Sequence, residues 1–154
     1  MKFAIGCDHA GFEFKEKVKE ILTRLGHEVI DFGTNSKESV DYPDFGLKVA
    51  HAVTDGKADR GVTVCWTGNG MNIVVNKVKG IRAGIALSPD MAFLTRSHND
   101  ANILTLAQKY TPEDQLEEIL KKFIETKFEG GRHIPRIEKI QAAEEELARA
   151  STKA

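Results

Sequence analysis

The chain has 154 residues, of which 41% are hydrophobic and 29% are charged, and its net charge is −1 at pH 7. This length and balance are typical of one globular domain, so residues 1–154 are expected to form a single domain. The balanced charge excludes a strongly basic nucleic-acid-binding surface, and no segment has the roughly 20 apolar residues of a membrane helix. The first residues lack the pattern of an export signal, which predicts a cytoplasmic protein that binds neither nucleic acid nor membrane.

Five short apolar runs are typical of β-strands. They cover residues 2–6, 28–32, 61–65, 82–86 and 102–106. The first, third and fifth are almost continuously apolar, as expected for strands that are covered on both faces.

Between and after these runs, apolar residues recur at helical spacing. Helices are predicted over residues 12–25, 44–53 and 70–77, from a cap at Ser88, from Thr111 to about 127, and over 135–150. Ser88-Pro89 and Thr111-Pro112 each combine a capping residue with a proline that fits the first turn. The alternation predicts an α/β fold with one doubly wound, five-stranded parallel sheet, Rossmann-like or flavodoxin-like, and a strand order of 2-1-3-4-5.

Residues from about 130 to 150 are expected to form a C-terminal arm and helix. The pair Gly130-Gly131 interrupts the chain, and apolar residues then recur at helical spacing in a charged segment. Because the sheet is already complete at this point, this helix packs either on its own subunit or on a second one.

The segment that follows the third strand is the strongest indication of function. An apolar run leads into Cys65-Trp66-Thr67-Gly68-Asn69-Gly70, and a helix is predicted to begin there. The two glycines allow a close approach of the backbone to a ligand, and the start of a helix offers free N–H groups to an anion. A thiol beside such groups indicates catalysis, and the alternative is that Cys65 is simply a small buried residue.

Further polar residues follow the first strand and the helix after the fourth. Asp8 and His9 lie beyond the first strand, and His98 and Asn99 end the later helix. In the assumed order, the strand order reverses between the first and third strands, and ligands bind beyond the carboxyl ends of the strands at that point. We therefore expect these residues to converge with Cys7, Cys65 and Thr67 on one crevice. The alternatives are that Asp8 caps a helix, that Cys7 only packs, and that His98 lies at a solvated helix end.

Two other features leave their roles open on the residues alone. Arg132 and Arg136 can form a bidentate phosphate clamp or belong to an ordinary basic turn. Trp66 can stack on a ligand or fill space. A disulfide between Cys7 and Cys65 is disfavoured by the expected reducing compartment.

Several motifs together resemble the ribose-5-phosphate isomerase type B family, which includes the subunits of galactose-6-phosphate isomerase. The resemblance runs from residue 1 to about residue 140. The motifs are Gly6-Cys7-Asp8-His9-Ala10-Gly11, Asp41-Tyr42-Pro43-Asp44, Cys65-x-Thr67-Gly68-x-Gly70, Asn76-Lys77, Gly80-Ile81-Arg82-Ala83, His98-Asn99-Asp100-Ala101-Asn102 and Gly130-Gly131-Arg132-His133.

The resemblance implies an aldose–ketose isomerase of a phosphorylated sugar, most simply ribose 5-phosphate, without a metal or an organic cofactor. It implies that Cys65 is the base of a cis-enediol mechanism and that Thr67 and His98 open the sugar ring. Some relatives use a glutamate ten residues further on as the base, and Val75 stands there in this chain.

The remaining implied roles concern substrate binding and assembly. Backbone N–H groups of the segment Gly68-Asn69-Gly70 would hold the enediolate, and Asp8 and Asn99 would hold sugar hydroxyls. His9, Arg132 and Arg136 would bind the phosphate, with the arginines reaching across from the second subunit of a homodimer, and a tetramer is left open. Trp66 stands where the family usually has glycine or serine, which leaves the exact sugar open.

Three alternatives to this function are considered. The chain is a non-catalytic phosphosugar-binding or regulatory module, or an isomerase of a hexose or tetrose phosphate, or it holds zinc through Cys7, His9, Cys65 and His98. No paired-ligand spacing typical of zinc sites supports the last of these.

Overall fold

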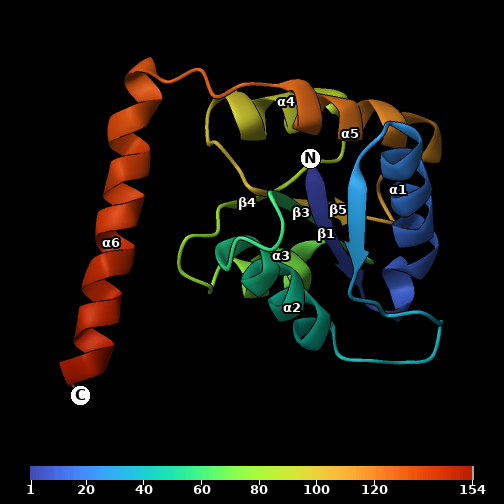
Figure 1. Ribbon diagram of the computed structural model, residues 1–154, viewed down its shortest axis with the longest axis horizontal. Coiled ribbons are helices and arrows are strands. Elements are labelled where there is room, and N and C mark those ends of the chain that lie inside the picture. The colour runs from blue at the N-terminus through green and yellow to red at the C-terminus, as the bar shows by residue number, and fades with distance from the viewer. Residues whose placement is uncertain (154) are drawn as a thin grey trace.

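The computed structural model describes residues 1–153 and contains a five-stranded, all-parallel sheet with helices on both faces (Figure 1). The strands are β1 (Lys2–Cys7), β2 (Glu28–Asp31), β3 (Arg60–Cys65), β4 (Ala83–Ile85) and β5 (Ile103–Ala107). The helices are α1 (Phe12–Arg24), α2 (Tyr42–Thr54), α3 (Asn69–Val75), α4 (Pro89–Ser97), α5 (Leu116–Glu125) and α6 (Ile134–Lys153). Three 3₁₀ turns are η1 (His9–Gly11), η2 (Glu113–Gln115) and η3 (Gly131–His133).

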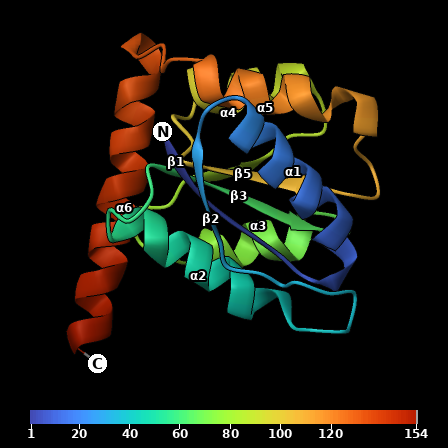
Figure 2. The same cartoon turned by 45° about the vertical axis from the view of Figure 1, so that its right-hand side comes forward.

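Two apolar cores lie on the two faces of the sheet. Helices α1, α4 and α5 cover one face, where Val18, Ala92 and Phe123 belong to the same buried cluster. Helices α2 and α3 cover the other face, where Val49 and Val75 are buried together (Figure 2). The predicted α/β class and parallel sheet are therefore confirmed. Within residues 1–153, no helix has the length and apolar character needed to cross a membrane.

The order of the strands differs from the prediction. The sheet runs β2-β1-β3-β5-β4, so β5 lies between β3 and β4 and the predicted order 2-1-3-4-5 is wrong. All five residues of β5 are buried, whereas the three residues of β4 are only partly buried. The more apolar strand takes the interior position because both of its faces are then covered. Strands β1 and β3 are still neighbours, so the point between them where the strand order reverses, and where a ligand site is expected, is unchanged.

One predicted helix start is confirmed and another is shifted. Ser88 caps α4, since its hydroxyl accepts a hydrogen bond from the Met91 N–H at 3.2 Å. Thr111-Pro112 instead precedes the 3₁₀ turn η2, and α5 begins only at Leu116. The proline fixes an extended backbone there, and a tight turn is needed before the helix can lie on the sheet.

The two cysteines are free thiols on opposite faces of the sheet. Cys7 is paired in register with Val64, the residue before Cys65. Because side chains alternate along a strand, Cys65 points away from the face that Cys7 occupies. Cys7 is fully buried in the core beside α1, as expected for a packing residue, and burial raises its pKa to about 12.

Candidate active site

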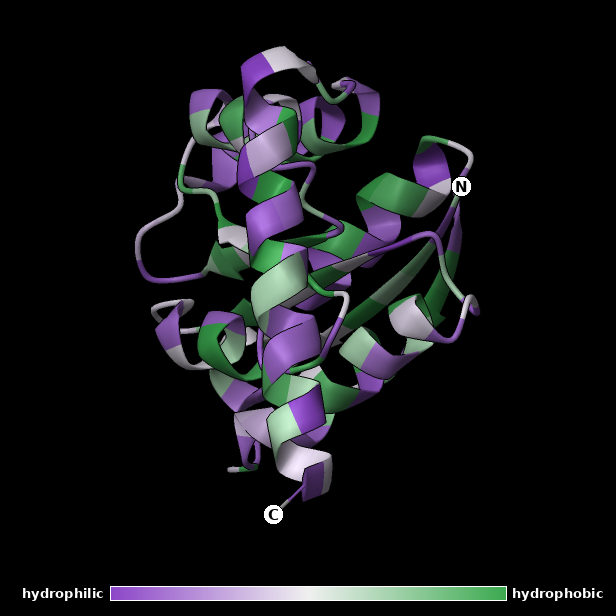
Figure 3. Cartoon of the chain, turned by 90° about the vertical axis from the view of Figure 1, so that its left-hand side faces the viewer, coloured by the Kyte–Doolittle hydropathy of each residue, from purple (hydrophilic) through white to green (hydrophobic). Residues whose placement is uncertain are grey.

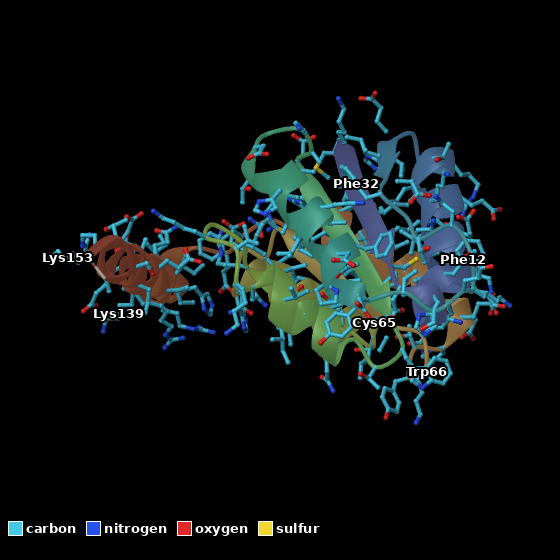
Figure 4. The ribbon with its side chains drawn as sticks, turned by 90° about the horizontal axis from the view of Figure 1, so that it is seen from below. Phe12, Phe32, Cys65, Trp66, Lys139 and Lys153 are labelled. Carbon is cyan, nitrogen blue, oxygen red and sulfur yellow. The ribbon has the colours of Figure 1, made fainter. Side chains whose placement is uncertain are left out.

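Cys65 occupies the last position of β3, at the carboxyl edge of the sheet. Its side chain is only 5% exposed, and the adjacent Trp66 is 48% exposed. Figure 4 shows both residues at the rim of the molecule, far from helix α6 with Lys139 and Lys153. Burial raises the pKa of the Cys65 thiol, although backbone N–H groups of Met71, Gly68 and Thr67 partly counter this effect. The thiol therefore lies at the carboxyl edge of the sheet and is almost fully covered by neighbouring atoms.

The turn after Cys65 has the compact form that its glycines predict. Gly68 has a φ of 81° and stands directly before α3, a left-handed conformation that side chains other than glycine rarely adopt. A Cβ atom on Gly70 would lie 2.5 Å from the ring of Tyr42. The Thr67 hydroxyl accepts the N–H of Asn69 at 3.3 Å. The first N–H groups of α3 therefore lie beside the thiol. Tyr42, which belongs to a quoted family motif but was given no role from the sequence, packs against the turn.

Asp8 and His9 follow the neighbouring strand β1 at the same edge. The Asp8 N–H donates to the carbonyl of Val64 at 3.3 Å, which joins this segment to the end of β3. One carboxylate oxygen of Asp8 accepts the N–H groups of Ala10 and Gly11, so Asp8 caps the 3₁₀ turn η1 and not helix α1 itself. The carboxylate lies close enough to Cys65 to favour the neutral thiol, which raises the thiol pKa further.

The ring of His9 is held in one orientation. Its Nδ1 lies 3.1 Å from the N–H of Val40 and accepts a hydrogen bond from it. A nitrogen that accepts a hydrogen bond carries no proton, so the imidazole proton is on Nε2. His9 thus offers an N–H donor from the loop that borders the cysteine.

A buried lysine supports this edge of the sheet. The ammonium of Lys15 is fully buried and donates to the Asp31 carboxylate at 2.9 Å and to the carbonyl of Thr34 at 2.8 Å. The backbone of Thr34 is in turn hydrogen-bonded to that of Cys7, directly before Asp8. Lys15 was missed by sequence reasoning because its place in a helix of alternating charges resembles that of any exposed lysine.

The other predicted site residues form a second cluster. His98 follows α4 and stacks on His133, with ring centroids 4.3 Å apart and 20° between the planes. His133 lies between Arg132 and Arg136, which are both exposed. Asn99 is exposed, and its carbonyl accepts the Arg82 Nε–H at 3.0 Å. His98, Asn99, Arg132 and Arg136 therefore lie together at the beginning of β4 and β5.

The expectation that both groups of residues converge within one chain is wrong. Cys65 is paired with Ala107, the last residue of β5, whereas His98 and Asn99 come before its first residue, Ile103. The first and last residues of β5 lie about 13 Å apart along the strand, at about 3.3 Å per residue. Helix α4 runs antiparallel to the strands, so it begins at the carboxyl edge of the sheet and ends at the opposite edge. Every helix that connects two parallel strands returns the chain to the opposite edge in this way, whatever the strand order.

The same arrangement excludes a zinc site formed within one chain by Cys7, His9, Cys65 and His98. Cys7 and Cys65 lie on opposite faces, and His98 lies at the opposite edge of the sheet. Among the described residues of one chain, these side chains do not form a common metal site.

Comparison with known proteins identifies the family. A family model described as Ribose/Galactose Isomerase matches residues 3–140. The chain belongs to this family. The motifs quoted above thus identified the family correctly, and the expected class of enzyme, an isomerase, is confirmed.

Individual relatives of this isomerase match over nearly their whole length. The ribose-5-phosphate isomerase B of Escherichia coli is 42% identical over 144 residues, which are 94% of this chain and 97% of the relative. The structure of ribose-5-phosphate isomerase B from Clostridium thermocellum has a TM-score of 0.93 and 48% identity, and the match covers 96% of this chain and 99% of that one. The enzyme from Mycoplasma genitalium, solved with bound ribulose-5-phosphate, has a TM-score of 0.89 and 37% identity over 94% of this chain and 97% of its own.

Proposed function

We propose that this isomerase interconverts ribose 5-phosphate and ribulose 5-phosphate, with Cys65 as the base. The observation that carries the proposal is the position of the thiol, at the rim of the sheet beside the N–H groups of a glycine-rich turn. The relative from Mycoplasma genitalium, which holds ribulose-5-phosphate, supports the choice of sugar.

The chemistry requires a base and a means of holding negative charge. The thiolate of Cys65 removes the proton from C2 of the open-chain aldose and a cis-enediolate forms. The proton of the O2 hydroxyl passes to O1, and the same sulfur returns its proton to C1, which leaves the ketose. A carbon acid is weak, so the negative oxygen needs placed donors. Backbone N–H groups of Gly68, Asn69 and Gly70 supply them, and Asp8 holds a sugar hydroxyl.

The remaining roles require a second subunit. We assign ring opening to Thr67 and His98, sugar contact to Asn99, and phosphate binding to His9, Arg132 and Arg136. In one chain these residues lie at opposite edges of the sheet. A homodimer that places the His98 edge of one subunit over the Cys65 edge of the other brings the two sets together, and its two sites are equivalent by symmetry. A further pairing of dimers into a tetramer is compatible with this arrangement.

The surface around helix α6 supports association between subunits. Ile137 is buried, whereas Ile134, Ile140 and Leu147 are exposed, so apolar residues recur among polar ones along the helix (Figure 3). Ile140 and Leu147 face β4 of the same subunit. The helix is tied to its own subunit by an ion pair between Lys79 and Glu145. A groove of about 400 Å³ lies between the helix and β4. A second copy that covers these side chains would remove their apolar surface from water.

The substrate assignment is tested with a panel of phosphorylated sugars. Purified protein is expected to isomerise ribose 5-phosphate faster than the phosphates of allose, galactose or erythrulose. Trp66 is exposed next to Cys65 in the chain, and we expect its bulky indole to disfavour longer sugars. A clear preference for a hexose or tetrose phosphate would show that ribose 5-phosphate is not the main substrate. Absence of turnover with every sugar phosphate would favour the non-catalytic binding module.

The rate is expected to depend on pH through the cysteine. Because burial raises the pKa of Cys65, most of the thiol is protonated at pH 7. The thiolate is the active form, so kcat/KM should rise about tenfold per pH unit from pH 7 until the raised pKa is reached. Stopped assays over pH 7–9.5, with iodoacetamide alkylation measured in parallel, check this. A flat profile with fast alkylation at pH 7 would show that the thiol is already ionised.

A further inference from the structure

We propose that His98, Glu129 and His133 form a zinc site and that zinc bound there inhibits the isomerase. The binding part of this proposal stands on the geometry of the three side chains. The inhibition part rests on the ring-opening role proposed for His98. The site shares only His98 with the zinc ligand set considered from the sequence.

The three potential ligand atoms already face one another. The Glu129 carboxylate lies 3.5 Å from Nε2 of His133 and 3.9 Å from Nε2 of His98. One ligand atom from each residue lies within 4.8 Å of the other two. Tetrahedral zinc with bonds of about 2.1 Å keeps its ligand atoms about 3.4 Å apart, which is close to the separations in this cluster. The two imidazole rings are stacked, so one ring must turn before both nitrogens face the same ion. The His98 side chain is 37% exposed and has room for this rotation.

An unsatisfied nitrogen points into the cluster. His133 is only 4% exposed, and its Nε2 has no hydrogen-bond partner among the described residues. A buried polar atom without a partner is unusual and calls for an explanation.

The backbone fixes the cluster before any ion arrives. The Glu129 N–H donates to the carbonyl of Ser97 at 2.9 Å, so the segment that carries Glu129 is joined to the end of α4. The His133 N–H donates to the carbonyl of Gly130 at 3.1 Å and closes the turn that returns His133 to His98. Two segments about thirty residues apart in sequence are thus held together, which lowers the entropic cost of forming a metal site.

The donor set favours zinc over the hard cations. Two imidazoles and one carboxylate are a ligand set of zinc sites with an open fourth position, whereas magnesium and calcium prefer oxygen ligands. Arg132 and Arg136 lie on the same segment and oppose a dication, and the negative charge of Glu129 offsets one of these two positive charges. Zinc held by His98 would occupy the imidazole that ring opening needs.

Cobalt is the direct probe of the site, because Co²⁺ replaces zinc and its absorption bands report its ligands. Titration of the full-length protein with Co²⁺ should give bands typical of nitrogen and oxygen ligands, and Zn²⁺ should displace them. Glu129→Gln removes one ligand without changing the size of the side chain and should weaken Co²⁺ binding and Zn²⁺ inhibition at least about tenfold. Glu125→Gln, an equal charge change at an exposed position on α5, should change neither.

The outcomes separate this proposal from the proposed function. Absence of cobalt bands, or bands and inhibition unchanged in Glu129→Gln, would overturn the site. A sulfur-to-cobalt charge-transfer band would also overturn it, since Cys65 would then be a ligand. If the protein isomerises no sugar, the proposed function fails, but the cobalt titration still decides whether the three side chains bind metal.

Discussion

Replacing Cys65 with alanine should lower kcat for ribose 5-phosphate about a hundredfold to ten-thousandfold, because a placed base contributes about 10²–10⁴ to such a proton transfer. Binding of the sugar phosphate should survive, since the phosphate and hydroxyl contacts assigned to His9, Asp8 and the arginines are untouched. Single-turnover assays and calorimetric titration with ribulose 5-phosphate measure the two quantities separately. The substitution removes only a sulfur atom from a side chain at the rim of the sheet.

Cys7→Ala is the matched control for this substitution. The two thiols lie one register position apart but on opposite faces of the sheet, and Cys7 packs in the core beside α1. Its loss should lower stability while leaving kcat of the folded protein within a few-fold of the original value. Full activity in Cys65→Ala, or an equal loss of kcat in Cys7→Ala, would show that the base is another group.

Much of the fold follows from local patterns in the sequence. The apolar runs of β1, β3 and β5 predict strands that are covered on both faces, and these strands are the buried ones, although the predicted order placed β5 at the edge of the sheet. The cap at Ser88 and the left-handed turn at Gly68 were likewise predictable, because each depends on the chemistry of one or two residues. The edge position of β4 was not predicted, since strand order depends on packing between distant segments.

The candidate site was only half predictable from topology. Asp8 and Cys65 were correctly placed together because both follow parallel strands at the carboxyl edge. His98 was wrongly added to them, because a helix that begins at this edge ends at the opposite one. The contributions of Tyr42 and Lys15 depend on three-dimensional contacts. Tyr42 stands in one of the quoted family motifs but received no role there, and the sequence around Lys15 looks like that of an ordinary exposed helix.

Because the proposed site is divided between two subunits, we expect two inactive variants to regain activity when they form mixed dimers. Cys65→Ala and His98→Asn proteins should each be inactive alone, because every site in either homodimer lacks the base or the ring-opening imidazole. In a mixed dimer, one site combines both defects, while the other combines an intact Cys65 with an intact His98. Random assortment of equal amounts makes half of the dimers mixed, so activity should return to about a quarter of the unmodified protein.

This complementation assay is therefore the most direct test of the account. The two variants are mixed, unfolded and refolded together, and the rate with ribose 5-phosphate is compared with that of each variant treated alone. Recovery to about a quarter of the original rate is the expected result. If the mixture stays as inactive as its components, Cys65 and His98 do not meet across subunits, and the proposed two-subunit site is wrong.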